Sequence, residues 1–338
     1  MARRGFLTAG TWVVDRNISV DHWPGEDMLA TVQKMDPAGG GPACNLGCDI
    51  RRLDPSIPVE TQGLIGDDSW ADFLVKVAVD HGIDATGLHR TDRAQTQVTD
   101  AYFSLKTGRR THILFPGAAP LMTPEHFDFS RTTARFLHMG LPGIHDGMDG
   151  PWGTDANGWV TVLKAGRAAG LETNLELVTA TDETIRRIVG PCLPHLDTLV
   201  VNDVEIGALG EMRTGRDGQA DPAACEAAAR KVLGIGAMEL IVVHFTSGAV
   251  LVARGGTALH VPSVAIPDAE RVGANGAGDA FAAGFFYGRH EGWALERCLR
   301  MAHATAAASL RAADTYSGVE SAERCMALAD RWGWREAL

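Results

Sequence analysis

The feature that most constrains the fold of this chain is an alternation of strand-like and helix-like segments that begins near residue 136. Short apolar strands are predicted at 136–139, 171–177, 198–201 and 240–245, with helices at 158–169, 181–189 and 223–233 between them. An antiparallel strand pair at 250–261 and helices at 277–287, 294–313 and 321–332 follow. Alternation sustained over about two hundred residues predicts an α/β fold with a doubly wound, mostly parallel sheet.

The first third of the chain adds strands that interrupt this pattern. A buried strand is predicted at 6–14, residues 16–38 are polar and irregular, and a hairpin is predicted with strands at 99–105 and 109–115. We expect the strands near 12–38 and 97–116 to form a small separate sheet over the carboxyl edge of the main sheet, where doubly wound folds bind ligands. No repeat or long linker divides the chain, so residues 1–338 are predicted to form a single domain.

Composition and charge exclude several classes of protein. The 338 residues are 45% hydrophobic and 22% charged, which excludes a disordered chain and a small disulfide-stapled scaffold. The net charge of −11 opposes binding to nucleic acid, and no apolar run reaches the roughly 18 residues of a membrane span. The six cysteines form no CxxC pair, and the apolar stretch after Arg3-Arg4 is too short for an export signal. We therefore expect a reduced, cytoplasmic protein that does not enter membranes.

The strongest local motif is a glycine-rich loop that opens a helix near residue 277. Gly276-Ala277-Gly278 brings successive backbone N–H groups to a helix N-terminus, where they and the helix dipole can bind an anion. Asp279 follows in the first helical turn. Two roles are open for it: an acid favoured there by the dipole alone, or a base that takes a proton from a hydroxyl attacking a bound phosphoryl group.

Two further motifs lie at predicted junctions that lead into helices. Gly40-Gly41 ends a glycine turn, and Asn45 follows in the next helix. Asn202 and Glu205 come directly after the strand at 198–201. This second pair could form a helix cap with a first-turn acid, or it could hold waters around Mg²⁺ on nucleotide phosphates. The spacing alone leaves both roles open.

In this order, the motifs resemble the signatures of the ribokinase-like (PfkB) carbohydrate kinases along nearly the whole chain. The matching segments are Gly40-Gly41 with Asn45 for GG-x-x-x-N, Asn202 with Glu205 for N-x-x-E, and Gly276-Ala277-Gly278-Asp279 for G-A-G-D. The resemblance implies a ribokinase-like fold and an ATP-dependent transferase that phosphorylates a primary hydroxyl of a sugar or sugar-like acceptor. It also implies that the small sheet is a substrate lid through which the chain forms a homodimer.

The resemblance also implies a role for each matching residue. Asp279 would be the general base, and the N–H groups of Gly276, Ala277 and Gly278 would form the anion hole. The acceptor sugar would be bound by Asp15, Gly40, Gly41 and Asn45. The ATP site would include Asn202, Glu205, His244, Thr246, Ser247, Gly248, Asn275 and His303, with Asn202 and Glu205 holding Mg²⁺ indirectly through water. For His303, contact with adenine and simple packing in an alanine-rich helix are both open.

Three segments depart from the family pattern. Relatives usually carry Asp-Thr-Thr or Asp-Thr-Asn before G-A-G-D, and Gly273-Ala274-Asn275 stands there in this chain, so dependence on a monovalent cation such as potassium is open. The segment 244–248 lacks one glycine of the usual Thr-x-Gly, so the geometry of the adenine loop is open too. The segment 173–176 lacks the arginine of D-x-N-x-R, which disfavours a 2-keto-3-deoxy sugar acid as acceptor.

Other functions stay in competition with a sugar kinase. A nucleoside kinase of the same fold would need an apolar clamp for its base, for which Trp12, Trp23 and Phe115 are available. A non-catalytic sugar or nucleotide sensor is favoured by the altered 273–275 loop and opposed by the retention of Asp279. A dinucleotide-dependent oxidoreductase is disfavoured because no GxGxxG follows the first strand. The arm Arg109-Arg110-Thr111-His112 is either a solvated strand or a source of a basic side chain for the substrate.

Overall fold

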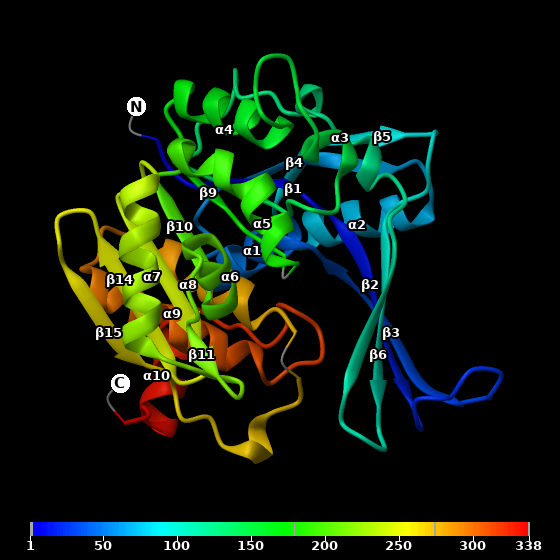
Figure 1. The fold of residues 1–338 in the computed structure, drawn as a ribbon. Coiled ribbons are helices and arrows are strands. Elements are labelled where there is room, and N and C mark those ends of the chain that lie inside the picture. The colour runs from blue at the N-terminus through cyan, green and yellow to red at the C-terminus, as the bar shows by residue number, and fades with distance from the viewer. Residues whose placement is uncertain (1–2, 179, 274, 337–338) are drawn as a thin grey trace.

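The computed structural model describes residues 3–178, 180–273 and 275–336, and it is built around two adjoining sheets (Figure 1). The first sheet is wholly parallel, in the order β5 (Asp84–Thr91), β4 (Val59–Gly66), β1 (Phe6–Gly10), β8 (Phe136–Gly140) and β9 (Glu172–Leu175). The second has the order β10 (Thr198–Asn202), β13 (Leu240–Phe245), β14 (Gly248–Ala253) and β15 (Ala258–Pro262), of which only β10 and β13 run parallel. A backbone hydrogen bond from Asp197 N to Thr173 O, 3.0 Å long, joins the two sheets. The predicted mostly parallel, doubly wound architecture is confirmed.

Helices cover both faces of these sheets. One face carries α1 (Pro42–Leu53), α2 (Ser69–Asp80), α8 (Ala277–His290), α9 (Leu295–Ser309) and α10 (Ala322–Trp332). The other carries α4 (Gly158–Ala168), α5 (Asp182–Val189), α6 (Asp203–Gly210) and α7 (Pro222–Ile235). Successive strand residues therefore enter different cores, as Phe6 and Leu7 do. Strands buried on both faces read as continuous apolar runs, and this is why the sequence predicted them well.

A separate four-stranded sheet extends from the body of the molecule (Figure 1). Its order is β3 (Val32–Gly40), β2 (Val13–Val20), β6 (Val98–Ser104) and β7 (Arg110–Phe115). The prediction of one strand over 6–14 was wrong, because the chain leaves β1 at Gly10, with φ 103°, and enters the small sheet at Val13. The prediction of an irregular segment at 16–38 was wrong where β2 and β3 lie, and only residues 21–31 are irregular. The polar residues of β2 are half-buried and residues 32–37 of β3 are exposed, which an antiparallel pair with a solvated face allows.

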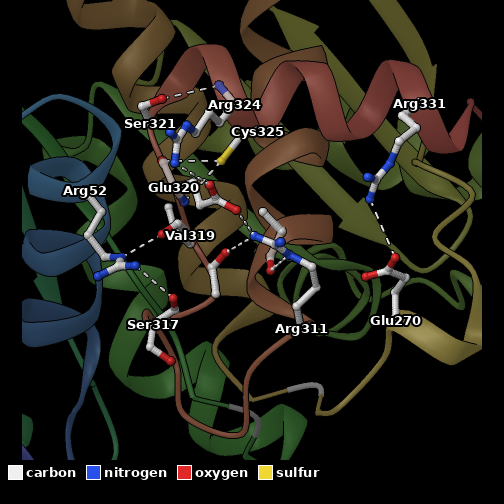
Figure 2. Close-up of polar contacts among 12 residues, drawn as sticks. Arg52, Glu270, Arg311, Ser317, Val319, Glu320, Ser321, Arg324, Cys325 and Arg331 are labelled. Carbon is white, nitrogen blue, oxygen red and sulfur yellow. Dashed lines mark hydrogen bonds and ion pairs between the residues drawn. The ribbon is translucent and has the colours of Figure 1, made fainter.

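Two arginines fix the loop between α9 and α10, one from the body of the molecule and one within the loop itself (Figure 2). Arg52, at the end of α1, donates from Nε to the Val319 carbonyl over 2.6 Å. Arg311 pairs with Glu320 at 2.5 Å. The loop starts earlier than predicted, because α9 ends at Ser309. These contacts fix the segment that carries Thr315, a residue of the site described below.

All six cysteines lie among the described residues, and each is buried and free of a disulfide. No helix in the ranges that the structure describes combines the length and the apolar character needed to cross a bilayer. A cytoplasmic location stays a prediction.

Candidate active site

A cavity of about 550 Å³ lies between the small sheet and the carboxyl ends of the parallel strands. It brings together most of the residues predicted to bind the acceptor or to catalyse, namely Asp15, Gly41, Asn45, Gly276, Ala277, Gly278 and Asp279, with Asn202, Glu205, His244 and Asn275 of the predicted ATP site. Segments from both ends of the chain thus meet at one place. Gly40 does not line the cavity itself. Of the altered 273–275 loop, Ala274 lies outside the described residues.

Gly276 shapes the start of α8. It adopts a left-handed conformation with φ 70°, and a Cβ there would lie 2.6 Å from the Thr315 side chain. The helix begins at once, because Ala280 N donates to Gly276 O over 2.8 Å. The N–H groups of the first turn have no partner within the helix. Residues 276–278 line the cavity, so this turn provides an anion-binding helix N-terminus beside Asp279.

Asp279 is held from two sides. Asn45 Nδ2 donates to its Oδ2 over 3.1 Å, and Thr315 Oγ1 in turn donates to Asn45 Oδ1 over 2.6 Å. On the other side, the carboxyl of Glu176 lies against the carboxyl of Asp279. Burial, and then the negative charge of Glu176, raises the pKa of Asp279 well above its usual range. A carboxyl of high proton affinity inside a cavity is suited to accept a proton.

No motif in the sequence identified Glu176 or Thr315 as a site residue. Glu176 belongs to the segment 173–176, which was notable only because it lacks an arginine. The available signal was position: Glu176 directly follows β9, and the carboxyl ends of parallel strands point to the ligand crevice. Thr315 lies in a loop without any such pattern, and it had no signal.

Asp15 faces the same cavity from β2. A Cβ on Gly40 would lie 2.2 Å from Asp15 Oδ2, so a glycine at that position makes room for this carboxylate. Burial, followed by the negative charge of Asp279, raises the pKa of Asp15 to about 7, although a hydrogen bond with Thr99 opposes the rise. Gly41 has φ 85° and precedes α1, where a Cβ would lie 2.5 Å from the Thr11 carbonyl. Both glycines are therefore needed for close approach.

Asn202 and Glu205 form a reciprocal cap on α6. Asn202 Oδ1 accepts from Glu205 N over 2.9 Å, and Glu205 Oε2 accepts from Asn202 N over 3.0 Å. Burial raises the pKa of Glu205 to about 7. Of the two roles left open by the sequence, capping is thus present. Both residues also line the cavity, so the second role is compatible with the first. The described residues include no group of three or more His, Cys, Asp or Glu side chains able to hold a metal by themselves.

A second cavity of about 480 Å³ meets the first at the start of α8. The two share Asn202, His244, Ala277 and Gly278, and Thr246 and His303 line only the second. Ser247 and Gly248 lie at the β13–β14 turn and line neither cavity, and Asn275 lines only the first.

His303 has an unusual environment in the second cavity. It is 4% exposed, and burial lowers its pKa to about 3, so the ring is neutral. Its ring makes an edge-to-face contact with the ring of Phe281, and the two ring centroids lie 5.0 Å apart. Its Nε2 atom has no hydrogen-bond partner among the described residues. A buried ring nitrogen without a partner, facing a cavity, is available to a ligand.

The arm of β7 is only partly solvated. His112 lines the first cavity, and Arg109 is exposed. Arg110 turns inward: its Nη1 is buried without a hydrogen-bond partner in the described part of the chain. Its Nη2 lies 2.8 Å from where a Cβ on Gly273 would stand, so this glycine leaves room for the guanidinium.

Comparison with known proteins identifies relatives of this arrangement. The model of the pfkB family of carbohydrate kinases matches residues 8–322. Among solved structures, ribokinase from Thermotoga maritima is 22% identical with a TM-score of 0.77, over 97% of this chain and 99% of that one. Ribokinase from Arabidopsis thaliana, complexed with ribose and ATP, is 21% identical with a TM-score of 0.77, over 97% and 99%.

A nucleoside kinase from Methanocaldococcus jannaschii, described as an archaeal member of the ribokinase family, is 15% identical with a TM-score of 0.74, over 98% of this chain and 100% of that one. No curated protein sequence matches the chain significantly. At these identities, the solved structures support the fold and leave the substrate open.

Proposed function

Because the chain belongs to the pfkB family of carbohydrate kinases, we propose that it transfers the γ-phosphoryl group of ATP to a primary hydroxyl of a sugar or sugar-like acceptor. The observation that carries this proposal is Asp279, a carboxyl of raised pKa that stands beside a helix N-terminus where two cavities meet. One cavity would hold the acceptor and the other the nucleotide. The single domain predicted for residues 1–338 belongs to this proposal.

In the proposed reaction, Asp279 accepts the proton of the acceptor hydroxyl as that oxygen attacks the γ-phosphorus. The bond between the γ-phosphorus and the β–γ bridging oxygen breaks, and ADP leaves. The N–H groups of Gly276, Ala277 and Gly278 stabilise the negative charge on the transferred group. Asn45 keeps the base oriented, because Thr315 fixes its amide. A positioned base contributes about 10²–10⁴-fold to such a transfer.

The nucleotide would occupy the second cavity. His303 Nε2 lacks a hydrogen-bond partner in the described part of the chain and would face the adenine, and Thr246 and His244 would line the phosphate path. Ser247 and Gly248 would act through the backbone of their turn. Asn202 and Glu205 fit Mg²⁺ held through water, because their oxygens are ligands of the type it prefers and they border both the cavity and the helix N-terminus. When bound, Mg²⁺ neutralises phosphate charge.

The acceptor cavity favours an uncharged polyol. Asp15, Asn45 and Glu176 line it, and among the described lining residues there is no lysine or arginine. A carboxylate or amide can bind neighbouring hydroxyls, whereas a sugar acid would meet like charges. Gly40 and Gly41 would let these groups approach the sugar closely. Whether a monovalent cation assists stays open, because Ala274 of the altered loop lies outside the described residues.

A nucleoside is the second candidate acceptor. The apolar side chains of Leu114, Ile144 and Leu177 line the same cavity, and they could pack against a base. Trp12, in contrast, is buried in the core and bonded to Thr61, so it is unavailable as a clamp.

We also propose that the four-stranded sheet serves as a lid and as a homodimer contact. Among the described residues, nine of the thirteen exposed large hydrophobic side chains belong to its strands and turns: Trp23, Met28, Leu29, Val32, Met35, Leu105, Ile113, Leu114 and Phe115. An apolar concentration of this kind is typical of an interaction surface.

The test is ADP release from Mg·ATP with a panel of sugars, sugar acids and nucleosides. Acceptor-dependent release by the wild type that Asp279→Asn abolishes would support the kinase and identify its acceptor class. Binding of ATP without release for any acceptor would favour the sensor. Preference for nucleosides over free sugars would favour the second candidate.

A further inference from the structure

Behind Asp279 lies a chain of polar contacts that the proposed reaction does not yet use. Asn174 of β9 accepts a hydrogen bond at Oδ1 from Val200 N, 3.2 Å away. Its Nδ2 lies 2.9 Å from Nδ1 of His138, which is 1% exposed. Nε2 of His138 lies 3.0 Å from Oε2 of Glu176, in contact but without the alignment of a good hydrogen bond.

This network fixes the tautomer of His138. Because Asn174 Oδ1 accepts from the backbone, its Nδ2 is the donor toward His138 Nδ1. A neutral imidazole whose Nδ1 accepts carries its proton on Nε2, on the side of Glu176. Burial lowers the pKa of His138 to about 4, so the ring carries no charge at neutral pH. His138 therefore presents an N–H dipole, and no full positive charge, to the Glu176 carboxyl.

The carboxyl of Glu176 is 19% exposed and lies against that of Asp279. Two buried carboxyl groups in contact cannot both be ionised at low cost, so the resting pair holds one proton. The other titratable groups around the pair are Asp15 from β2, Asp49 from α1, Glu205 from α6 and the neutral His244 from β13, and His112 of β7 lines the same cavity. None of the first four groups brings a positive charge that would release the proton. Burial raises the pKa of Glu176 to about 7.

We propose that Glu176, oriented by His138 and Asn174, is a positioning residue that shares one proton with Asp279 and sets the pH at which the base becomes active. This inference rests on the proposed function. In the working state the shared proton has left the pair, and the negative charge of Glu176 raises the proton affinity of the Asp279 carboxylate. Asp279 then takes the hydroxyl proton as the new O–P bond forms and the γ-phosphoryl leaves ADP. Glu176 stays ionised during the transfer, and solvent later removes the transferred proton from the pair.

The first experiment compares the pH profiles of kcat/KM for the wild type, Glu176→Gln and Glu172→Gln. A glutamine keeps the shape of the side chain and removes its negative charge. We expect Glu176→Gln to move the acidic limb down by about one pH unit, with turnover on the alkaline plateau within about tenfold of wild type. Glu172 is the matched control: it lies on β9 and pairs with Arg135 and Arg289 away from the cavity. The variant Glu172→Gln should keep the acidic limb of the wild-type profile.

Two outcomes would overturn the proposal. A profile of Glu176→Gln that superimposes on the wild type would show that Glu176 does not govern the base. A raised acceptor KM at every pH, with an unmoved limb, would make Glu176 an acceptor ligand instead. Both readings require a folded variant, which far-UV circular dichroism and a thermal melt check.

A second measurement uses the wild type and needs no turnover. Carboxyl ¹³C NMR, with Asp279→Asn to assign the pair, follows the titration of the two groups directly. We expect two separate steps above the ordinary carboxylate range, reduced to one in Asp279→Asn. Two ordinary, independent titrations would overturn the proposal. If no acceptor is phosphorylated, the proposed function fails, and this titration still tests the pair.

Discussion

Asn45 Nδ2 and Asp279 Oδ2 are joined by a 3.1 Å hydrogen bond that links the N-terminal turns of α1 and α8. The bond brings the early glycine motif of the chain into contact with the late one. Thr315 fixes the direction of the Asn45 amide, so the amide nitrogen and not its oxygen faces the carboxylate. The orientation of the base thus depends on three segments far apart in the sequence.

Replacing Asp279 by asparagine should lower turnover by about 10²–10⁴-fold, because an amide cannot accept the hydroxyl proton. ATP affinity should stay within about threefold, since the backbone donors at the start of α8 remain. Stopped assays of ADP release and calorimetric ATP binding measure the two effects. Asp182→Asn is the matched control, an exposed first-turn aspartate of α5, and it should leave turnover unchanged. Near-normal turnover of Asp279→Asn would remove this residue from the role of base.

Replacing Asp15 by alanine should raise the acceptor KM by at least about tenfold while the KM for ATP stays close to that of the wild type. The physical reason is the loss of a buried carboxylate that would bind sugar hydroxyls at the acceptor end of the cavity. Initial-rate kinetics with each substrate varied in turn measure the split. An unchanged acceptor KM would place the acceptor elsewhere in the cavity.

The carboxyl of Asp15 makes the free energy of unfolding depend on pH. Its pKa rises from the ordinary value of 3.8 to about 7 on folding, so the folded state holds a proton that the unfolded chain has already lost. Stability from this group is therefore present at low pH and falls as pH rises from about 4 to about 7. We expect Asp15→Asn to melt at the wild-type temperature at pH 4 and above it at pH 8. Equal melting temperatures at both values would contradict the raised pKa.

Local sequence signals were sufficient for the body of the fold. The apolar runs of β10 and β13 and the glycine turn before α8 each have a cause within a few neighbouring residues. The small sheet was harder, because β2 and β3 are polar and their pairing depends on a partner, β6, some eighty residues away. Because apolar residues continue past Gly10, the sequence predicted a single strand there. The chain turns at Gly10 through a positive φ, which the composition does not reveal.

The residues of the site also fall into two groups, those that sequence motifs predicted and those that only the structure identifies. Asp279, Asn45 and Asp15 belong to motifs with a recognisable spacing, and they line the same cavity. Glu176 and Thr315 became site residues only through tertiary contact. Whether Asn202 and Glu205 cap a helix or face the ligand was undecidable from spacing, because the same two side chains can do both.

Arg110 offers a test of a buried charge whose guanidinium lies over the ring of Phe103, 5.9 Å from its centroid. Burial lowers the pKa of its guanidinium, and no carboxylate among the described residues compensates for the lost hydration. Arg110→Met keeps the aliphatic stem and removes the charge, so we expect the ligand-free protein to melt about 1–2 °C higher. Arg109→Met, at the exposed neighbouring position, should not change the melting temperature. Differential scanning calorimetry measures both, and a lower melting temperature for Arg110→Met would mean that the charge has a stabilising partner.

The apolar surface of the small sheet predicts the oligomeric state. Val32 and Met35 lie on β3, an edge strand, and they are 49% and 53% exposed. If this sheet joins two copies of the chain, glutamates at both positions would bury like charges against each other in the dimer. We expect the double variant Val32→Glu, Met35→Glu to sediment as a monomer at concentrations where the wild type is a dimer. Val79→Glu, on α2 and 63% exposed, is the control that should leave the dimer intact. Dissociation by Val79→Glu alone, or a dimer that survives both glutamates, would move the contact away from this sheet.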